Sequence, residues 1–320
     1  MIVLFALLSA CFEVDPLFHN PVNCEAIGPA TCEDKDDPWG KLCTPCDEPY
    51  DFGLDYAWTA DTLGGLSVRP IDGSTVQEAR FTTDDGLAEL DAFFIPAHGD
   101  DPDLARVTVV YNHGNYAGLE HYLPRIRMLH EMGFSVYAWD YRQYGKSDAV
   151  GAPSGEQFIA DSRTALLQAK ALAEAQTAGP LLIYGYSLGG IPAVEMALQD
   201  QGCGLILETP FTSVKAAGIS NSAVAMPGSF IASGLYENVD KIRGYEGPLL
   251  LMAGDADTVF TEQDLVALYD NAPGPKQLWI LPGVGHGIGG TGGVPEAGLG
   301  AYFDTIRGFL QETAPGCLAE

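Results

Sequence analysis

The chain has 320 residues, 47% of them apolar, a share that excludes a wholly disordered protein. Forty-three Asp and Glu against sixteen Lys and Arg give a formal net charge of −27. Because this charge repels phosphate groups, it argues against nucleic acid as a partner and against binding to an anionic membrane surface. The length accommodates one large α/β domain with an appendage, or two small domains.

The chain begins with a short apolar segment, residues 2–8. This segment is too short to cross a hydrocarbon core of ~30 Å as a helix, but it fits a signal peptide. The sequence LSAC that ends at Cys11 resembles a bacterial lipobox, although no Lys or Arg precedes the apolar residues. We therefore expect residues 1–11 to be a lipoprotein signal and Cys11 to be lipidated, so that an exported protein contacts the membrane only through its lipid. Plain secretion and a structural first strand are the alternatives.

Six further cysteines are in the chain. Four of them lie in an acidic stretch, residues 12–58, that has too few large apolar residues for a core of its own: Cys24, Cys32, Cys43 and Cys46. We expect this stretch to be a tether stapled by disulfides, as is usual in exported proteins, with a zinc site as the alternative because the last two have C-x2-C spacing. Four cysteines allow three pairings, all open at this point. Cys203 and Cys317 can form a further bridge, since both are expected at the bottom of one sheet.

From residue 76 onward the pattern becomes regular. Residues 76–82 and 89–96 alternate apolar and polar side chains around an Asp-Asp-Gly turn, which predicts an antiparallel hairpin. The following apolar stretches are typical of buried parallel strands: 107–111, 134–139, 181–186, 205–207, 249–252 and 278–281. Helical spacing predicts the intervening helices: 119–132, 156–175, 188–199, 262–269 and 296–312.

This order predicts an α/β fold, a mostly parallel, doubly wound sheet of about eight strands with helices on both faces. We expect it to occupy residues 59–313, followed by a tail, 314–320. The short segment 212–247 predicts a small cap. Five of its apolar residues either line an apolar mouth or pack as an ordinary helix: Met226, Phe230, Ile231, Leu235 and Tyr236.

A G-x-S-x-G motif stands where a predicted strand ends and a predicted helix begins: Gly185-Tyr186-Ser187-Leu188-Gly189. A serine in this place lies on a tight, strained turn that raises its hydroxyl above the sheet. Side chains larger than glycine at the two ends of the motif would clash with the adjacent strand and helix. The helix that follows directs its amide end at the site, which favours negative charge there. We therefore predict that Ser187 is a nucleophile.

A serine hydroxyl is a poor nucleophile at neutral pH and needs a base. Of the six histidines only His286 follows the last predicted strand, where a loop can carry its ring over Ser187. His19 lies in the expected tether, and we expect His98, His121 and His130 to be surface or packing residues. The supporting acid is expected after the preceding strand, where Asp255 and Asp257 compete, while Glu208 follows a strand that does not suit this order.

Together these residues resemble the α/β-hydrolase family over about residues 60–313. The sequence DYRQYGKS at 140–147 is similar to the family's D-x-R-G-x-G-x-S turn, and PFTS at 210–213 to the segment after its sixth strand. The features are similar to those of serine-aminopeptidase-like and lysophospholipase-like hydrolases, a grouping whose name does not establish a substrate. Gln143 replaces the usual glycine of the turn, which requires another backbone angle or strain. The glycine-rich stretch 283–300 predicts a mobile loop around the base.

The resemblance implies the remaining site residues. In the family the acid is the third residue after the glycine of its loop, which selects Asp257 and leaves Asp255 as a turn residue. Two backbone amides would hold the oxyanion: that of Leu188, directly after the nucleophile, and that of Asn115, in the loop after the first parallel strand. The ring of His113 would brace that loop.

The implied function is hydrolysis of small-molecule carboxylic esters through an acyl-enzyme, without a metal or organic cofactor. The net charge favours neutral esters over polyanionic ones. Thioesterases, lysophospholipases and peptidases with the same three residues are close alternatives. A non-catalytic binding protein on the same fold is the alternative from a different class.

Overall fold

The computed structural model describes residues 19, 21, 23–26, 44–52, 69–116, 118–220, 234–287 and 293–318. The signal segment 1–11, Cys32 and Cys43 lie outside these residues. Lipidation of Cys11 and the domain boundary near residue 59 therefore stay predictions.

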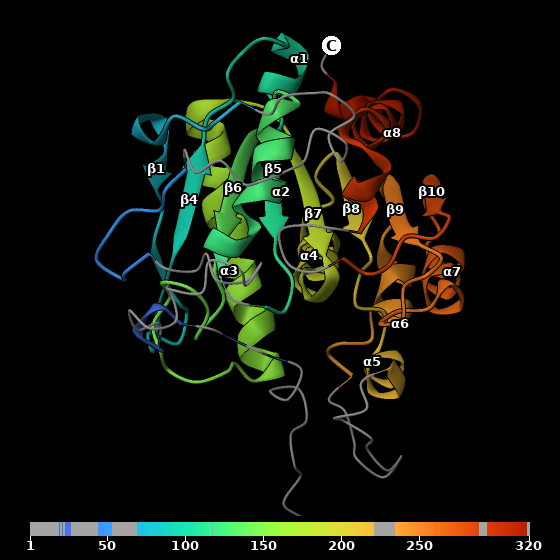
Figure 1. Ribbon diagram of the computed structural model, residues 1–320, viewed down its shortest axis with the longest axis horizontal. Helices are drawn as coiled ribbons and strands as arrows, with labels where there is room; N and C mark the ends of the chain where they lie inside the picture. The colour runs from blue at the N-terminus through green and yellow to red at the C-terminus, as the bar shows by residue number, and fades with distance from the viewer. Residues whose placement is uncertain are drawn as a thin grey trace, which may run out of the picture.

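An eight-stranded sheet crosses the molecule in the order β1-β4-β6-β5-β7-β8-β9-β10 (Figure 1). Its strands are β1 (Gln77–Glu78), β4 (Ala92–Ile95), β5 (Thr108–Asn112), β6 (Ser135–Trp139), β7 (Leu181–Tyr186), β8 (Gly204–Glu208), β9 (Leu249–Gly254) and β10 (Lys276–Leu281). β4 runs antiparallel to both neighbours, and the strands from β6 to β10 are parallel. A ribbon of β2 (Phe81–Thr82) and β3 (Glu89–Leu90) extends the hairpin. The predicted sheet and its antiparallel edge are confirmed.

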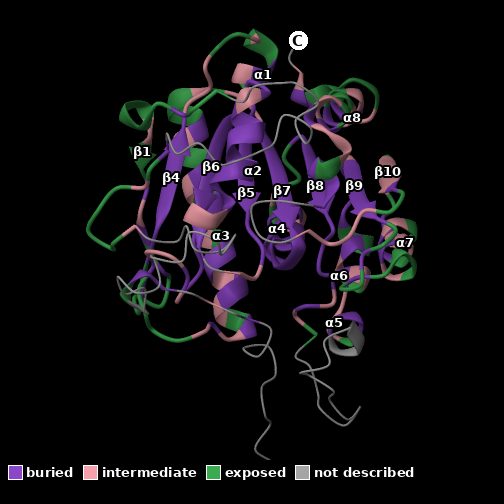
Figure 2. Ribbon diagram, in the orientation of Figure 1, coloured by how far each residue is buried: buried purple, intermediate pink, exposed green. Residues whose placement is uncertain are grey.

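Helices cover both faces, because alternate strand residues point to opposite sides. Val109 and Tyr111 belong to a core shared with α2 (Leu119–Glu131) and α8 (Leu299–Glu312). On the other face, Val110 packs in the core of α3 (Gly155–Gln176), α4 (Gly190–Gln199) and α7 (Glu262–Asn271). Three shorter helices complete the described part: α1 (Pro102–Ala105), α5 (Val214–Ser220) and α6 (Asn238–Lys241). Figure 2 shows the central strands buried between exposed outer loops.

Several predicted helix ends differ from the observed ones. The helix predicted at 296–312 is divided at Gly298, whose φ of 90° ends a 3₁₀ turn, η8 (Val294–Ala297), before α8 begins. α1 was not predicted because it is only four residues long, although Asp101 caps it and Pro102 opens it.

The segment predicted as a cap contains α5, α6 and the 3₁₀ turn η7 (Ile242–Gly244). Met226, Phe230 and Ile231 lie outside the described residues. Tyr236 is fully buried, and its ring centroid lies 6.0 Å from those of Phe158 and Phe211. Of the two alternatives for Tyr236, packing in the core is therefore the one that the structure supports.

Two disulfides join cysteines within the described residues. Cys203, directly before β8, is bonded to Cys317 in the 3₁₀ turn η9 (Pro315–Cys317), as the sequence suggested. Cys24 is bonded to Cys46, which excludes the zinc alternative for these two residues, while Cys32 and Cys43 lie outside the described residues. Disulfides are typical of an oxidising, exported environment. None of the helices in the described ranges is long and apolar enough to cross a membrane.

Candidate active site

Ser187 lies at the carboxyl end of β7, on a strained turn. Its φ is 51°, in the left-handed region, at a cost of about 1–3 kcal/mol. A Cβ added to Gly185 would lie 2.6 Å from the Cβ of Ala193, and one added to Gly189 would lie 2.1 Å from the carbonyl oxygen of Asn112. The turn that raises the serine hydroxyl therefore requires glycine on both sides.

The serine meets an imidazole and a carboxylate. Ser187 Oγ lies 2.8 Å from His286 Nε2, and His286 Nδ1 lies 2.8 Å from Asp257 Oδ2. The other carboxylate oxygen, Oδ1, accepts hydrogen bonds from the backbone N–H groups of Val259 at 2.7 Å and Phe260 at 3.0 Å. These two bonds fix the carboxylate so that Oδ2 faces the ring. The three side chains come from loops after β7, β9 and β10.

The two competing carboxylates have other partners. Asp255 Oδ1 accepts the N–H of Gly283 at 2.6 Å and joins the loops after β9 and β10, which is the role of a turn residue. Glu208 is buried, forms an ion pair with Arg125 and accepts the hydroxyl of Tyr184. Among the three candidate acids, the geometry brings Asp257 to the imidazole.

Two aromatic rings lie close to the imidazole of His286. The ring of Tyr186 lies 5.9 Å from it at an interplanar angle of 30°, and that of Phe260 lies at 5.8 Å. Burial raises the pKa of Tyr186 to about 12, so its hydroxyl stays protonated and donates to the carbonyl of His286 at 3.3 Å. The N–H of Ala256 donates to the carbonyl of Val284 at 3.0 Å. The described part of the loop is therefore tied to the acid's own loop, while residues 288–292 lie outside the described residues.

The predicted oxyanion donors come from two segments of the chain. Leu188 follows it directly in the 3₁₀ turn η5 (Ser187–Gly189). Asn115 lies in the loop after β5, and its side-chain Oδ1 accepts the hydroxyl of Tyr144 at 2.8 Å. In the same loop the buried ring of His113 stacks on Tyr141 at 3.9 Å and so braces the loop.

The turn after β6 keeps a glycine-like backbone although Gln143 occupies the glycine position. Its φ is 72°, the strained outcome of the two expected from the sequence. The Gln143 N–H donates to the carbonyl of Asp148 at 3.1 Å, and its side-chain Oε1 accepts the N–H of Gly151 at 2.7 Å. These hydrogen bonds offset part of the strain.

Sequence reasoning missed three buried residues beside the site. His19, assigned to a tether, is buried with its Nε2 2.9 Å from the hydroxyl of Tyr236. Burial lowers the pKa of His19 to about 3. Tyr144 reaches Asn115, and the guanidinium of Arg125 lies 4.0 Å from the ring centroid of Tyr186. The only available signal was for Tyr144, which belongs to the motif at 140–147.

Chemically, the three aligned groups can pass a proton from a hydroxyl to an imidazole that a carboxylate orients. Within the described residues, no group of three or more His, Cys, Asp and Glu could hold a metal ion.

The comparisons with known proteins agree with this architecture. A family model described as serine aminopeptidase, S33, matches residues 103–240. The uncharacterized protein YfhR of Escherichia coli (strain K12) is 30% identical over 220 residues, which cover 67% of this chain and 75% of that protein. Protein bem46 of Schizosaccharomyces pombe is 30% identical over 219 residues, which cover 65% of this chain and 68% of that protein.

Two solved structures share the fold. The Pyrococcus furiosus esterase Pf2001 superimposes with a TM-score of 0.57 at 20% identity, covering 84% of this chain and all of that one. Est1E from Butyrivibrio proteoclasticus, with ferulic acid bound, gives a TM-score of 0.55 at 17% identity and covers 73% of this chain and 98% of its own. The chain belongs to the α/β-hydrolase family, and hydrolysis is the chemistry that this membership supports.

Proposed function

We propose that the protein is a serine hydrolase that cleaves carboxylic esters, with Ser187 as nucleophile, His286 as general base and Asp257 as the orienting acid. The observation that carries the proposal is the pair of 2.8 Å contacts from serine to imidazole and from imidazole to carboxylate. These are the distances that proton transfer and tautomer control require.

The first half of the reaction forms an acyl-enzyme. His286 Nε2 takes the proton of Ser187 Oγ as Oγ bonds to the carbonyl carbon, and the carbonyl's electron pair moves to its oxygen. The amides of Leu188 and Asn115 stabilise this oxyanion. When the carbonyl re-forms, the bond to the leaving oxygen breaks and His286 protonates the alcohol. Asp257 stabilises the imidazolium between these steps.

The second half returns the free enzyme. His286 removes a proton from a water molecule as the water oxygen attacks the acyl carbon. Collapse of the second tetrahedral intermediate breaks the bond to Ser187 Oγ, which regains its proton from His286 and releases a carboxylic acid.

A neutral ester of small or medium size is the substrate class that we infer. The net charge of −27 repels polyanionic substrates. Ser187 is only 8% exposed, which favours a slender acyl group at the reacting carbon. The Pyrococcus protein that shares this fold is named an esterase, which agrees with an ester substrate.

Labelling with a fluorophosphonate probe tests the proposal. We expect wild type and the surface control Ser74→Ala to label and Ser187→Ala to remain unlabelled. On p-nitrophenyl esters of rising chain length, Ser187→Ala should lose about 10³–10⁶-fold in kcat. Parallel p-nitroanilides test amide cleavage. Folded wild-type protein that neither labels nor hydrolyses any of these esters would refute the proposal.

A further inference from the structure

The loop that carries Asn115, residues 112–116, which we call the oxyanion loop, rests on the turn after β6. The hydroxyl of Tyr144 donates to Asn115 Oδ1 at 2.8 Å. The hydroxyl of Tyr141 donates to the carbonyl of His113 at 2.6 Å. Two tyrosines of one turn thus fix two residues of the oxyanion loop.

We call residues 140–147 the brace turn. This turn also packs closely against the start of α2, which follows the oxyanion loop in the sequence. Asp140 Oδ1 accepts the N–H of Leu119, the first residue of α2, at 2.9 Å. A Cβ added to Gly118 would lie 2.3 Å from the Cα of Gly145. The brace turn is therefore packed against the start of α2 and bonded to the oxyanion loop through Tyr141 and Tyr144, so a displacement of the turn must disturb both.

Residues near the disulfide-bonded Cys24 form hydrogen bonds with the backbone of the brace turn. We call the described residues 19, 21 and 23–26, together with residues 44–52, the stapled segment. In it the N–H of Cys24 donates to the carbonyl of Gly145 at 2.8 Å, and the side-chain amide of Asn23 donates to the carbonyl of Ser147 at 2.7 Å. The bonds lie on both sides of Lys146 and order the turn's carboxyl half.

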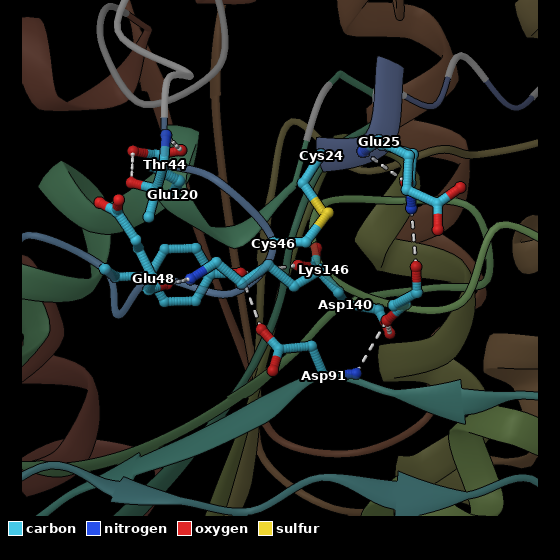
Figure 3. Close-up of a disulfide and its surroundings, with 12 residues drawn as sticks. Cys24, Glu25, Thr44, Cys46, Glu48, Asp91, Glu120, Asp140 and Lys146 are labelled. Carbon is cyan, nitrogen blue, oxygen red and sulfur yellow. Dashed lines mark hydrogen bonds between the residues drawn. A yellow bond between two sulfur atoms is a disulfide. The ribbon is translucent and has the colours of Figure 1, made fainter. Parts of the chain in front are cut away.

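The other arm of the stapled segment holds the same turn from a second direction (Figure 3). The ammonium of Lys146 donates to the carbonyl of Glu48 and lies 3.9 Å from the ring centroid of Tyr50. The hydroxyl of Tyr50 in turn donates to Asp91 Oδ2 at 2.7 Å. The Cys24–Cys46 disulfide joins the two arms, so both meet the brace turn as one unit.

A third contact reaches the critical tyrosine itself. His19 Nδ1 lies 3.4 Å from the hydroxyl of Tyr144, while His19 Nε2 lies 2.9 Å from that of Tyr236. Both tyrosines are fully buried. The hydroxyl that orients Asn115 is therefore enclosed by a residue that precedes it by 125 positions.

We propose that the stapled segment is a positioning element of the active site, which holds the brace turn so that Tyr144 fixes Asn115 under the developing oxyanion. A simple tether does not require the three sets of contacts with the brace turn that are described above. The inference rests on the proposed function, because it assigns work to the oxyanion loop. It predicts an effect on kcat with little effect on KM, since the oxyanion exists only in the reaction.

Tyr144→Phe is the first test, because it removes one hydroxyl and keeps the ring. We expect kcat on p-nitrophenyl acetate to fall about ten- to hundredfold, with KM within about twofold of wild type. Tyr137→Phe is the matched control: Tyr137 is equally buried and its hydroxyl donates to Gln168, on α3, at 3.2 Å. Wild-type kcat in Tyr144→Phe would overturn the proposal.

The second test cuts the staple with the double variant Cys24→Ser/Cys46→Ser. We expect a fall in kcat of about tenfold and slower fluorophosphonate labelling of Ser187, again with little change in KM. Adding Tyr144→Phe should then cost less than it does in wild type, because both changes act through one contact.

Independent, fully additive effects, or wild-type kcat in the cysteine variant, would overturn the role of the stapled segment. If the cysteine variant does not fold, the kcat and KM of His19→Ala replace it and must follow those of Tyr144→Phe. Wild-type protein that hydrolyses no ester and does not label at Ser187 would instead refute the proposed function, so the two failures are distinguishable.

Discussion

The two sides of the candidate active site are held in different ways. On the nucleophile side, the orientation of Asp257 is set by two backbone N–H groups of its own loop, and Ser187 by the glycines of its own motif. On the oxyanion side, Asn115 is oriented by Tyr144, whose turn is gripped by Cys24 and its neighbours more than a hundred residues earlier. Contacts between residues close in the sequence can be recognised as a motif. Contacts between residues more than a hundred positions apart cannot.

The largest expected effect tests the nucleophile side. Asp257→Asn should lower kcat on p-nitrophenyl esters by about 10⁴-fold, because the amide no longer holds the productive imidazole tautomer. Asp255→Asn is the matched control, two residues away. The side-chain oxygen of the new asparagine can still accept the N–H of Gly283, so its kcat should stay within about tenfold of wild type. The reverse outcome would show that Asp255 is the acid.

The second prediction concerns stability away from both sides. The Cys203–Cys317 disulfide closes a separation of 114 residues, against 22 for Cys24–Cys46. On the chain-entropy model, Cys203→Ser/Cys317→Ser should lower the free energy of unfolding by roughly 4–5 kcal/mol. It should leave kcat unchanged below its unfolding temperature, because Cys203 precedes β8 at the amino end of the strands, whereas Ser187 follows the carboxyl end of β7. Urea unfolding and ester assays on the same samples measure both quantities.

A fall in kcat for this variant as large as that of Cys24→Ser/Cys46→Ser would contradict the distinction between the two disulfides. Both would then act through general stability.

The third prediction addresses the place where the two sides touch. A Cβ on Gly189 would lie 2.1 Å from the carbonyl oxygen of Asn112 and 2.6 Å from that of His113. Gly189→Ala must therefore push the oxyanion loop away from the turn that carries Ser187. We expect kcat to fall about a hundredfold and stability to fall by about 1–3 kcal/mol. Gly308→Ala in α8, where nothing lies within 4 Å of the added Cβ, should be neutral or stabilising. Thermal unfolding and p-nitrophenyl acetate hydrolysis separate these outcomes, and wild-type kcat in Gly189→Ala would contradict the tight fit.

The same contrast explains how far the sequence alone could lead. Alternating strands and helices, and the glycines around Ser187, are local patterns, so the mostly parallel sheet with its antiparallel edge and the tight turn at Ser187 were predictable from them. The choice of Asp257 over Asp255 needed the family resemblance. The Cys24–Cys46 pairing and the burial of His19 depend on contacts with residues far along the chain, which no local pattern encodes.

Gln143 illustrates a second limit. The sequence showed that a glycine was missing and left two outcomes open. Only the structure shows that the backbone keeps its φ of 72° and that Asp148 and Gly151 supply the hydrogen bonds that help to hold it there. A propensity is thus overridden when surrounding contacts outweigh a strain of about 1–3 kcal/mol.

The smallest expected effect sharpens the oxyanion side, where a buried carboxylate supports the stapled segment. Burial, reinforced by the nearby charge of Asp140, raises the pKa of Asp91 to about 6. Because the folded state then binds its proton more tightly than the unfolded state, stability is fullest at acid pH and decreases as pH rises from about 4 to 6 and above. Between pH 4.5 and 7.5 the ionisation of Asp91 should lower the free energy of unfolding by about 2 kcal/mol.

Asp91→Asn removes this ionisation, while the side-chain oxygen of the new asparagine can still accept the hydroxyl of Tyr50. The stability of Asp91→Asn relative to wild type should therefore rise by about 2 kcal/mol between pH 4.5 and 7.5, as measured by urea unfolding at both pH values. Gly308→Ala on α8 provides the control, because it changes no ionisable group and should keep the same offset from wild type at both pH values. An equal offset for Asp91→Asn at the two pH values would mean that Asp91 ionises without cost in the folded state. The oxyanion side would then be held by hydrogen bonds alone, without a buried charge working against them.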